Sequence, residues 1–365
     1  MNPLNHGRLD FLQNPVTANY ALRLSATELK FLGWNFRPTP HAFINDSCLF
    51  HVRTLFLQWE RFFAFKCFQL TRASGGLRLR KRLRELLSGS IPSEELATIS
   101  SSYDIVGEIA IIRLPLNTEK TPAIAEAIMN IHKNVKTVMA QTSRVKGNFR
   151  VRSLSHVAGE NRTVTVHRES GCLFSVDVAE CYFSPRLSYE RARIASLVKR
   201  GETVVNMFAG VGCFSILIAK QAASAKVFSI DVNPSAFRFM DENIRLNKVC
   251  GRVIPLLGDS KTIIENQLQG SADRVLMPLP EKALEYLPTA LSALKPSGGW
   301  LHYYDFEHVL KNDTPIEKTK AKVAEKLAHL GLACELPFSR VVRSVGPNWY
   351  QTVLDLHIAS VPGKS

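Results

Sequence analysis

The sequence predicts a doubly wound α/β domain with an antiparallel pair of strands at one edge, preceded by a small α+β domain and a basic N-terminal domain. Three observations support this prediction. From Arg186 onward, apolar segments alternate with helical patterns of about ten to fifteen residues, which is typical of a mainly parallel sheet. The last two apolar segments have no helix between them. Much of the excess positive charge lies in one stretch near the N-terminus.

The N-terminal region, residues 1–98, is rich in arginine and aromatic residues. The whole chain of 365 residues has a formal charge of +14 at pH 7. Basic residues that neutralise phosphates release bound counterions, so this charge favours a nucleic acid partner, although a solvated helix face has the same composition. We therefore predict that this region binds a nucleic acid. The densest part of the charge is Arg72, Arg78, Arg80, Lys81, Arg82 and Arg84.

Residues 99–180 are predicted to form the small α+β domain and to contribute to RNA binding and to the active site. Apolar, β-branched residues over 103–113 indicate a pair of strands, and apolar positions at helical spacing indicate a helix over 123–140. Further strands are expected over residues 149–152, 163–167 and 173–178.

The α/β alternation belongs to the C-terminal domain, residues 181–365. An open α/β sheet binds its ligand beyond the carboxyl ends of the strands, beside the point where the strand order reverses. The residues that follow the first strands are therefore candidates for a binding site. Helices are expected over residues 187–199, 213–224, 234–247, 281–294 and 315–330. Strands are expected over residues 203–208, 226–231, 252–257, 274–277, 299–306, 334–342 and 350–358.

Three successive strand ends carry groups suited to an adenosine. The loop Phe208–Gly212 has small residues that let the backbone approach a ligand, and a helix N-terminus follows it. Asp231 stands where an acid can accept from ribose hydroxyls, although a helix-capping role would use the same residue. Asp259 and Ser260 follow the third strand and can accept from an adenine amino group. Ser215 replaces the third glycine of the dinucleotide signature, so S-adenosylmethionine is favoured over NAD.

Six collinear segments resemble the archaeal and eukaryotic tRNA guanine-37 N1-methyltransferase family. They are Tyr103–Ala110, Tyr182–Arg191, Met207–Gly212, Ile230–Pro234, His302–Tyr304 and Arg340–Tyr350. The resemblance implies a class I methyltransferase, Rossmann-like in its sheet, that uses S-adenosylmethionine on tRNA in the cytoplasm. Residues 1–98 resemble the tRNA-elbow-binding domain of that family only by position and basicity.

The resemblance also implies a catalytic mechanism. Methylation of guanine N1 requires removal of its proton by a base, and a cation can stabilise the charge that develops on O6. Glu190 matches the general base of the family, although an ordinary helix acid paired with a neighbouring arginine would look the same. One arginine of residues 149–152 matches the O6 contact; the register is open, and we prefer Arg152 over Arg150. Arg186, in the same motif as Glu190, is grouped with the catalytic residues.

The cofactor-binding residues that the resemblance implies surround the strand ends. Two of them depart from the family pattern, because Asn206 stands where the family has Asp and Pro278 where it has Asn. Asn206 lacks the charge that would balance the cofactor ammonium, and Pro278 offers neither a side-chain amide nor a backbone N–H. Weaker or redirected activity is therefore a hypothesis. The full set is Arg191, Asn206, Phe208, Gly210, Gly212, Asp231, Val232, Asp259, Ser260, Pro278 and Pro280.

Two alternatives stay open: a wybutosine-pathway enzyme that transfers the aminocarboxypropyl arm of the same cofactor to tRNA, and a catalytically weakened RNA-binding relative. Seven scattered cysteines without a CxxC pair predict neither a zinc site nor a disulfide framework, and they favour a reducing compartment. The histidines show no metal-ligand spacing, so no catalytic metal is expected. No long apolar run predicts a membrane span. We expect a monomer.

Overall fold

The computed structural model describes residues 85–88, 103–113, 120–143, 147, 149–310 and 313–361. Contacts within the chain separate residues 1–75 from residues 76–365, and every described residue belongs to the second unit. The basic stretch Arg72–Arg84 and nearly all of the domain predicted over residues 1–98 lie outside the described residues. These two interpretations, and the predicted domain boundaries, therefore stay predictions.

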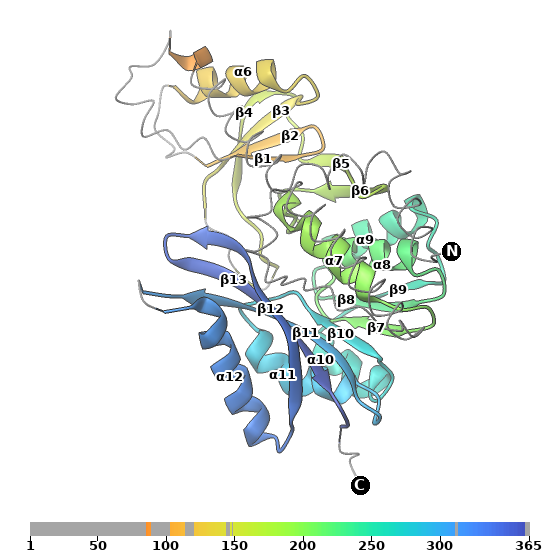
Figure 1. Cartoon of the computed structure of the whole chain (residues 1–365). Helices are drawn as coiled ribbons and strands as arrows, with labels where there is room; N and C mark the ends of the chain where they lie inside the picture. Colours follow the sequence, from red (N-terminus) through yellow and green to blue (C-terminus); the bar gives the residue numbers. More distant parts are fainter. Residues whose placement is uncertain are drawn as a thin grey trace, which may run out of the picture. The chain divides into compact units, whose positions relative to one another are not determined.

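A four-stranded sheet with the order β1-β2-β3-β4 forms the small α+β domain (Figure 1). The sequence pairs its first two strands as a short antiparallel hairpin, and the crossover helix α6 then makes β3 parallel to β2. Ile124 and Ile128 on the apolar face of α6 are buried in the core of this domain. The elements are β1 (Tyr103–Val106), β2 (Ile109–Ile112), α6 (Thr121–Ile131), β3 (Thr137–Gln141) and β4 (Leu154–Gly159).

Two predictions in this domain were wrong. The helix expected over residues 123–140 ends at Ile131, and β3 begins at Thr137. Val138 satisfies both a helical spacing and a strand pattern, and the turn between the two elements is held by Asn134, whose amide donates to the Gly107 carbonyl at 3.1 Å. The strand expected over residues 149–152 is reduced to a single bridge at Val151, because Arg150 has a positive φ of 53°.

A hairpin connects the small sheet to the C-terminal domain. β5 (Val164–Glu169) and β6 (Cys172–Asp177) pair in an antiparallel register. Asn243, in the helix over Pro234–Leu246, fixes this hairpin to that helix. The Asn243 Oδ1 accepts from the Ser175 N–H at 2.6 Å, and the Asn243 Nδ2 donates to the Ser175 carbonyl at 2.9 Å. Buried backbone groups of β6 are thus satisfied by a side chain of another element.

The C-terminal domain contains a seven-stranded sheet with the order β12-β13-β11-β10-β7-β8-β9. Five strands are parallel, and β13 runs antiparallel to both β11 and β12, which confirms the predicted antiparallel edge. The chain fills one half of the sheet from β7 to β9 and then returns to β10, so the strand order reverses between β7 and β10. The strands are β7 (Thr203–Asn206), β8 (Lys226–Asp231), β9 (Val253–Leu257), β10 (Arg274–Met277), β11 (Gly299–His308), β12 (Cys334–Gly346) and β13 (Trp349–Ile358).

Helices cover both faces of this sheet (Figure 1). Strand side chains alternate between the two faces, so Tyr304 packs in the core with α8 and α9 while Tyr303 packs in the core with α11 and α12. None of the described helices is long and apolar enough to cross a membrane. The helices are α7 (Ser188–Leu197), α8 (Cys213–Gln221), α9 (Pro234–Leu246), α10 (Ser260–Ile263), α11 (Ala283–Ala293) and α12 (Pro315–His329), with short turns η2 (Pro185–Leu187) and η3 (Ile264–Leu268).

Candidate active site

A pocket opens at the carboxyl ends of β7, β8, β9 and β10, where the strand order reverses. The empty space inside it, including its open mouth, is about 810 Å³, a size suited to a small organic ligand. Strand ends and the loops after them supply most of its wall. The lining residues are Phe149, Arg150, Tyr182, Met207, Phe208, Gly210, Asp231, Val232, Asn233, Ala236, Gly258, Asp259, Ser260, Pro278, Leu279, Lys282 and Tyr286.

Asp231 ties the glycine loop to the end of β8. Its Oδ2 accepts from the Gly210 N–H at 2.6 Å, and its Oδ1 accepts from the Asn233 N–H at 2.9 Å. Gly210 and Gly212 both have positive φ, 56° and 89°, which explains why glycine occupies these positions. Burial raises the pKa of Asp231, against the opposing effect of its backbone donors. Each oxygen keeps capacity for one more donor, as a ribose contact requires.

The third strand end is organised by Asp259. Its Oδ1 caps α10 by accepting from the Lys261 N–H at 2.9 Å, and its Oδ2 accepts from the Tyr286 hydroxyl at 2.7 Å. Burial, followed by the Asp259 carboxylate, raises the pKa of Tyr286 to about 12. Tyr286 also packs edge-on against Phe208, with ring centroids 5.3 Å apart. The acid expected at an adenine edge is thus also a helix cap.

These groups fit S-adenosylmethionine on two independent observations. Ser260 lines the pocket, and its buried Oγ has no hydrogen-bond partner within the described part of the chain. The Val232 side chain is 43% exposed although it is apolar, and it stands beside the Asp231 carboxylate in the same wall. A ligand with vicinal hydroxyls and a flat aromatic base would bond to the first kind of group and cover the second.

Another part of the pocket lining is aromatic and basic. Arg150 lies over the Tyr182 ring, with its guanidinium carbon 4.3 Å from the centroid, and pairs with Glu281 at 3.0 Å. The Arg150 Nε is buried without a partner among the described residues. Arg343 donates to the Tyr182 hydroxyl at 2.9 Å. Burial alone would raise the pKa of Tyr182, but Arg343 and Arg150 outweigh burial and lower it.

Glu190 lies in the first turn of α7, outside the pocket lining, and is 1% exposed. Its Oε1 accepts from the Tyr304 hydroxyl at 2.8 Å and from the Arg193 guanidinium at 2.6 Å. Its Oε2 accepts from the Arg193 Nε at 3.1 Å and lies 4.0 Å from the Arg340 Nε. One acceptor position on Oε2 is therefore less engaged than those on Oε1.

The bonds of Arg193 continue into a chain of buried charges. Arg193 also donates to Asp355 at 2.5 Å, and Asp355 accepts from the His302 Nδ1 at 2.6 Å. Arg274 bonds to the His302 Nε2 at 2.7 Å and to Glu202 at 2.8 Å. Because Arg274 can only donate, Nε2 must accept, so His302 is the neutral Nδ1–H tautomer. In agreement, burial lowers the pKa of His302.

The predicted site residues therefore fall into two groups. Eight of them line the pocket, namely Arg150, Phe208, Gly210, Asp231, Val232, Asp259, Ser260 and Pro278. The others lie elsewhere: Glu190, Arg152, Arg186, Arg191, Asn206, Gly212 and Pro280. Arg191 pairs with buried Glu169 at 2.7 Å. Asn206 is fully buried, with its amide donating to the Ser215 hydroxyl at 3.0 Å and its Oδ1 unpaired within the described residues.

Several pocket residues had no assigned role in the sequence interpretation. Tyr182 stands at the start of the motif that also contains Glu190, so its position in that motif was an available signal. Phe149 begins the segment 149–152, which was singled out only for its arginines, whereas Lys282 and Tyr286 lie in no motif. Within the described residues, no group of three or more His, Cys, Asp or Glu side chains is placed to hold a metal ion.

Comparison with protein families gives two matches. Residues 165–330 match the TRM5/TYW2 methyltransferase domain, and residues 83–163 match the TYW2 N-terminal domain.

Comparison with individual proteins gives relatives with several different names. The chain is 40% identical over 277 residues to tRNA (guanine(37)-N(1))-methyltransferase Trm5b of Pyrococcus abyssi, covering 76% of this chain and 80% of that protein. It is 38% identical over 256 residues to tRNA 4-demethylwyosine(37)-methyltransferase Taw21 of Saccharolobus solfataricus, covering 69% and 92%. It is 32% identical over 254 residues to the tRNA(Phe) (4-demethylwyosine(37)-C(7)) aminocarboxypropyltransferase of Methanocaldococcus jannaschii, covering 69% and 96%.

Solved structures give the same picture of the fold. The complex of aTrm5 with tRNALeu is similar with a TM-score of 0.65 and 38% identity, covering 76% of this chain and 78% of that chain. The similarity therefore covers about three quarters of this chain, and the similar protein was solved in complex with tRNA.

Proposed function

Because the chain belongs to the TRM5/TYW2 methyltransferase family of S-adenosylmethionine-dependent enzymes that modify tRNA at position 37, we propose that it methylates N1 of guanine-37. The observation that carries this proposal is that one pocket contains both kinds of binding group. Asp231 and Ser260 suit the adenosine part of the cofactor, while Arg150 and Tyr182, in another part of the lining, suit a purine base.

The chemistry assigned to the chain is proton removal and charge stabilisation. When bound, S-adenosylmethionine supplies a sulfonium-activated methyl carbon and leaves as the neutral thioether. Glu190 takes the N1 proton of guanine on Oε2, its less engaged oxygen, and this frees the N1 electron pair to form the new N–C bond. Arg150 donates to O6, where negative charge develops as the proton leaves. Tyr182 stacks on the purine.

The O6 contact is assigned to Arg150 on the basis of position. Arg150 lines the pocket, whereas Arg152 donates to the Gln141 amide oxygen at 3.3 Å and lies outside the lining. The buried Nε of Arg150 has no partner among the described residues, so it has a bond to offer a ligand.

The two departures from the family pattern affect different parts of the site. Asn206 is fully buried behind the pocket, so the loss of a charge there acts on the cofactor only through the surrounding structure. Pro278 lines the pocket itself and offers a carbonyl but no N–H. We therefore expect Pro278 to affect the orientation of the target base more than Asn206 affects cofactor affinity.

Aminocarboxypropyl transfer is the second candidate, and one observation favours it. The segment 83–163 matches the TYW2 N-terminal domain, and a relative with the aminocarboxypropyltransferase name covers 69% of the chain. Both reactions use the same cofactor, and the carbon of the sulfonium that faces the nucleophile decides between them. A third relative methylates 4-demethylwyosine by name, so the base at position 37 is also to be tested.

The testing experiment incubates the full chain with S-adenosylmethionine and unmodified tRNA and then identifies the modified nucleoside by mass spectrometry. We expect N1-methylguanosine at position 37, and no product with a transcript that has adenosine there. A nucleoside carrying the much heavier aminocarboxypropyl group would contradict the proposal and establish the second candidate. Binding of both cofactor and tRNA without any product would point to a catalytically weakened relative.

A further inference from the structure

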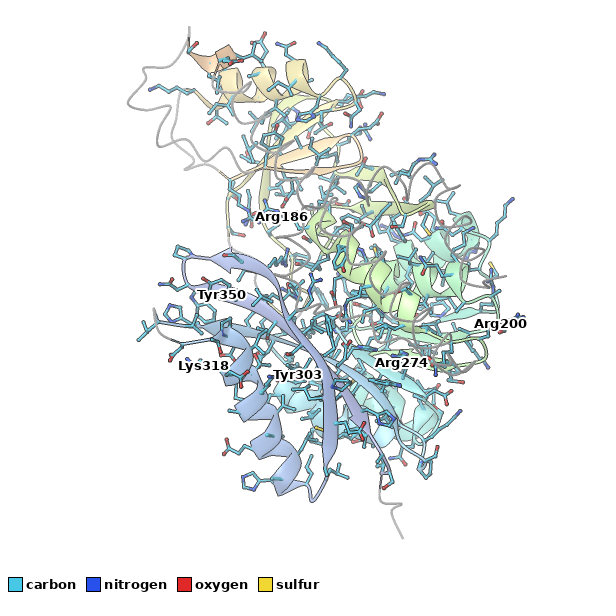
Figure 2. All side chains as sticks on the ribbon, viewed as in Figure 1. Arg186, Arg200, Arg274, Tyr303, Lys318 and Tyr350 are labelled. Carbon is cyan, nitrogen blue, oxygen red and sulfur yellow. The ribbon has the colours of Figure 1, made fainter. Side chains whose placement is uncertain are left out.

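Two arginines, Arg113 and Arg186, lie beside the Asp104 carboxylate outside the pocket, and the charges of these three groups act on a third arginine, Arg152. Arg113 follows β2, Arg152 precedes β4 and Arg186 lies in η2, so three segments distant in sequence meet here. Figure 2 labels Arg186, which lies between the small sheet and the start of α7. The shared carboxylate is Asp104 of β1, whose side chain is only 7% exposed.

The contacts within this arginine cluster are unequal. The Arg186 Nε donates to the Asp104 Oδ1 at 2.6 Å, whereas the nearest Arg113 nitrogen is 3.7 Å from Oδ2, beyond a normal hydrogen bond. Arg152 is bonded to Gln141 instead. Burial lowers the pKa of Arg152, Asp104 opposes this, and the charges of Arg113 and Arg186 lower it further. The three cations therefore act on one another electrostatically.

The four side chains carry a formal charge of +3 from the arginines and −1 from Asp104, which sums to +2. Like charges held close together around a buried group are costly unless an anion compensates them. The cluster is also accessible, because the side chains of Arg113 and Arg186 are 47% and 34% exposed. Guanidinium groups match the oxygens of a phosphate in pairs, so the ligand class that fits is a phosphate.

We propose that the arginine cluster binds a backbone phosphate of the RNA substrate next to the target nucleotide. The inference rests on the proposed function for the identity of that nucleotide. Arg152 is two residues from Arg150, and two residues span at most about 7 Å of chain. The positive φ of Arg150, 53°, breaks the alternation of an extended segment, so Arg150 lines the pocket while Arg152 joins the cluster. One short segment thus contacts both a base and its neighbouring phosphate.

The test compares Arg113→Gln with Arg238→Gln as a matched control. Both arginines lie 3.7 Å from a carboxylate, Asp104 and Glu180 respectively, and both are substantially exposed. Binding of fluorescent tRNA is measured at several salt concentrations. For Arg113→Gln we expect about tenfold weaker binding at low salt and a slope of log affinity against log salt that is smaller by about 0.7 to 0.9, as for the loss of one phosphate contact. The control should change neither affinity nor slope.

Equal slopes for the two variants would overturn the inference. A second arm uses inorganic phosphate against chloride at equal ionic strength. Phosphate could raise the melting temperature of the wild type but not that of Arg113→Gln, while the salt slope of tRNA binding stays unchanged. That combination would show that the cluster binds a small phosphorylated molecule, and the RNA assignment would then be wrong. Because tRNA binding is read without turnover, a reduced slope would stand even if the product analysis contradicted N1 methylation.

Discussion

The Glu190 environment and the strand-end pocket differ in how completely their polar groups are bonded. Glu190 and Asp355 are both paired to Arg193, and His302 bonds to Asp355 and Arg274 at once. In the pocket, by contrast, the Ser260 hydroxyl and the Arg150 Nε are buried with no partner among the described residues. Buried polar groups are normally bonded, so unpaired atoms in a pocket wall indicate the positions that a ligand completes.

The difference indicates that the pocket serves binding, whereas Glu190 serves the chemical step. The pocket is lined by Ser260 and Arg150, and each of these residues has one buried polar atom without a partner among the described residues. Glu190 is held in position by strong bonds, and a guanine N–H must compete for the Oε2 acceptor that faces Arg340. We infer that the protein holds the general base Glu190 firmly in place and that the RNA brings the target guanine into alignment with it. Changes at Glu190 should therefore lower turnover, whereas changes at Asp231, on the adenosine side of the pocket, should lower cofactor affinity.

The largest effect is expected for Glu190→Gln. The amide keeps the shape of the side chain but cannot take a proton, so kcat should fall by about 100- to 10,000-fold, as is typical when a general base is lost. The affinity for S-adenosylmethionine should stay within twofold of the wild type, because Glu190 lies outside the pocket lining. Single-turnover methylation and calorimetry measure the two quantities, and Glu242→Gln on exposed α9 surface is the matched control.

A parallel loss of cofactor affinity and turnover in Glu190→Gln would contradict this interpretation. It would show that the bonds of Glu190 to Arg193 and Tyr304 mainly stabilise the fold. Breaking a buried ion pair commonly costs about 3 to 5 kcal/mol of unfolding free energy, so the melting temperature must be recorded alongside.

The contrast between the two regions also explains what sequence reasoning could reach. The alternation of strands and helices predicted the sheet, and the residues after successive strands predicted Asp231, Asp259 and Ser260, all of which line one pocket. Each of these depends on local pattern alone. The buried chain of charges depends on strand register: His302 and Asp355 are direct partners across β11 and β13, 53 residues apart in sequence. Nothing local in either strand indicates that pairing.

The structure also separates the two arginines between which the sequence could not decide. Residues 149–152 were expected to be extended, which places Arg150 and Arg152 on the same side. The positive φ of Arg150 separates them, and such a backbone conformation is rare for a residue other than glycine. Gly147 and Asn148, directly before this segment, were an available turn signal, and the Arg150 N–H donates to the Gly147 carbonyl at 3.1 Å.

The second prediction concerns those two arginines. Arg150→Gln should lower kcat by about 100- to 1,000-fold, the usual cost of losing a donor to a developing oxyanion, with tRNA affinity little changed. Arg152→Gln should do the reverse, weakening tRNA binding while kcat at saturating tRNA stays near that of the wild type. Steady-state kinetics with tRNA as the varied substrate distinguishes the two. If Arg152→Gln abolished turnover at saturation and Arg150→Gln did not, the O6 contact would belong to Arg152.

The smallest of the three effects is expected for Asp231→Asn, which tests the pocket alone. Hydrogen bonds to a charged group contribute about 1.5 to 3 kcal/mol, so the affinity for S-adenosylmethionine should fall by about 10- to 100-fold. At saturating cofactor, kcat should be nearly that of the wild type. Asp241→Asn on α9, whose carboxylate pairs with Arg245, is the matched control and should leave cofactor binding unchanged.

Asp231 also gives the pocket a pH dependence with a definite sign. Burial raises the pKa of this carboxyl above its ordinary value of 3.8, so protonation begins at a higher pH than for an exposed aspartate. The protonated form has lost the charge that strengthens bonds from ribose hydroxyls. Cofactor affinity of the wild type should therefore weaken as pH falls through this raised pKa, while Asp231→Asn binds weakly at every pH. Calorimetric titrations across the acid range that showed parallel curves for the two proteins would remove Asp231 from the ribose contact and leave the glycine loop as its sole role.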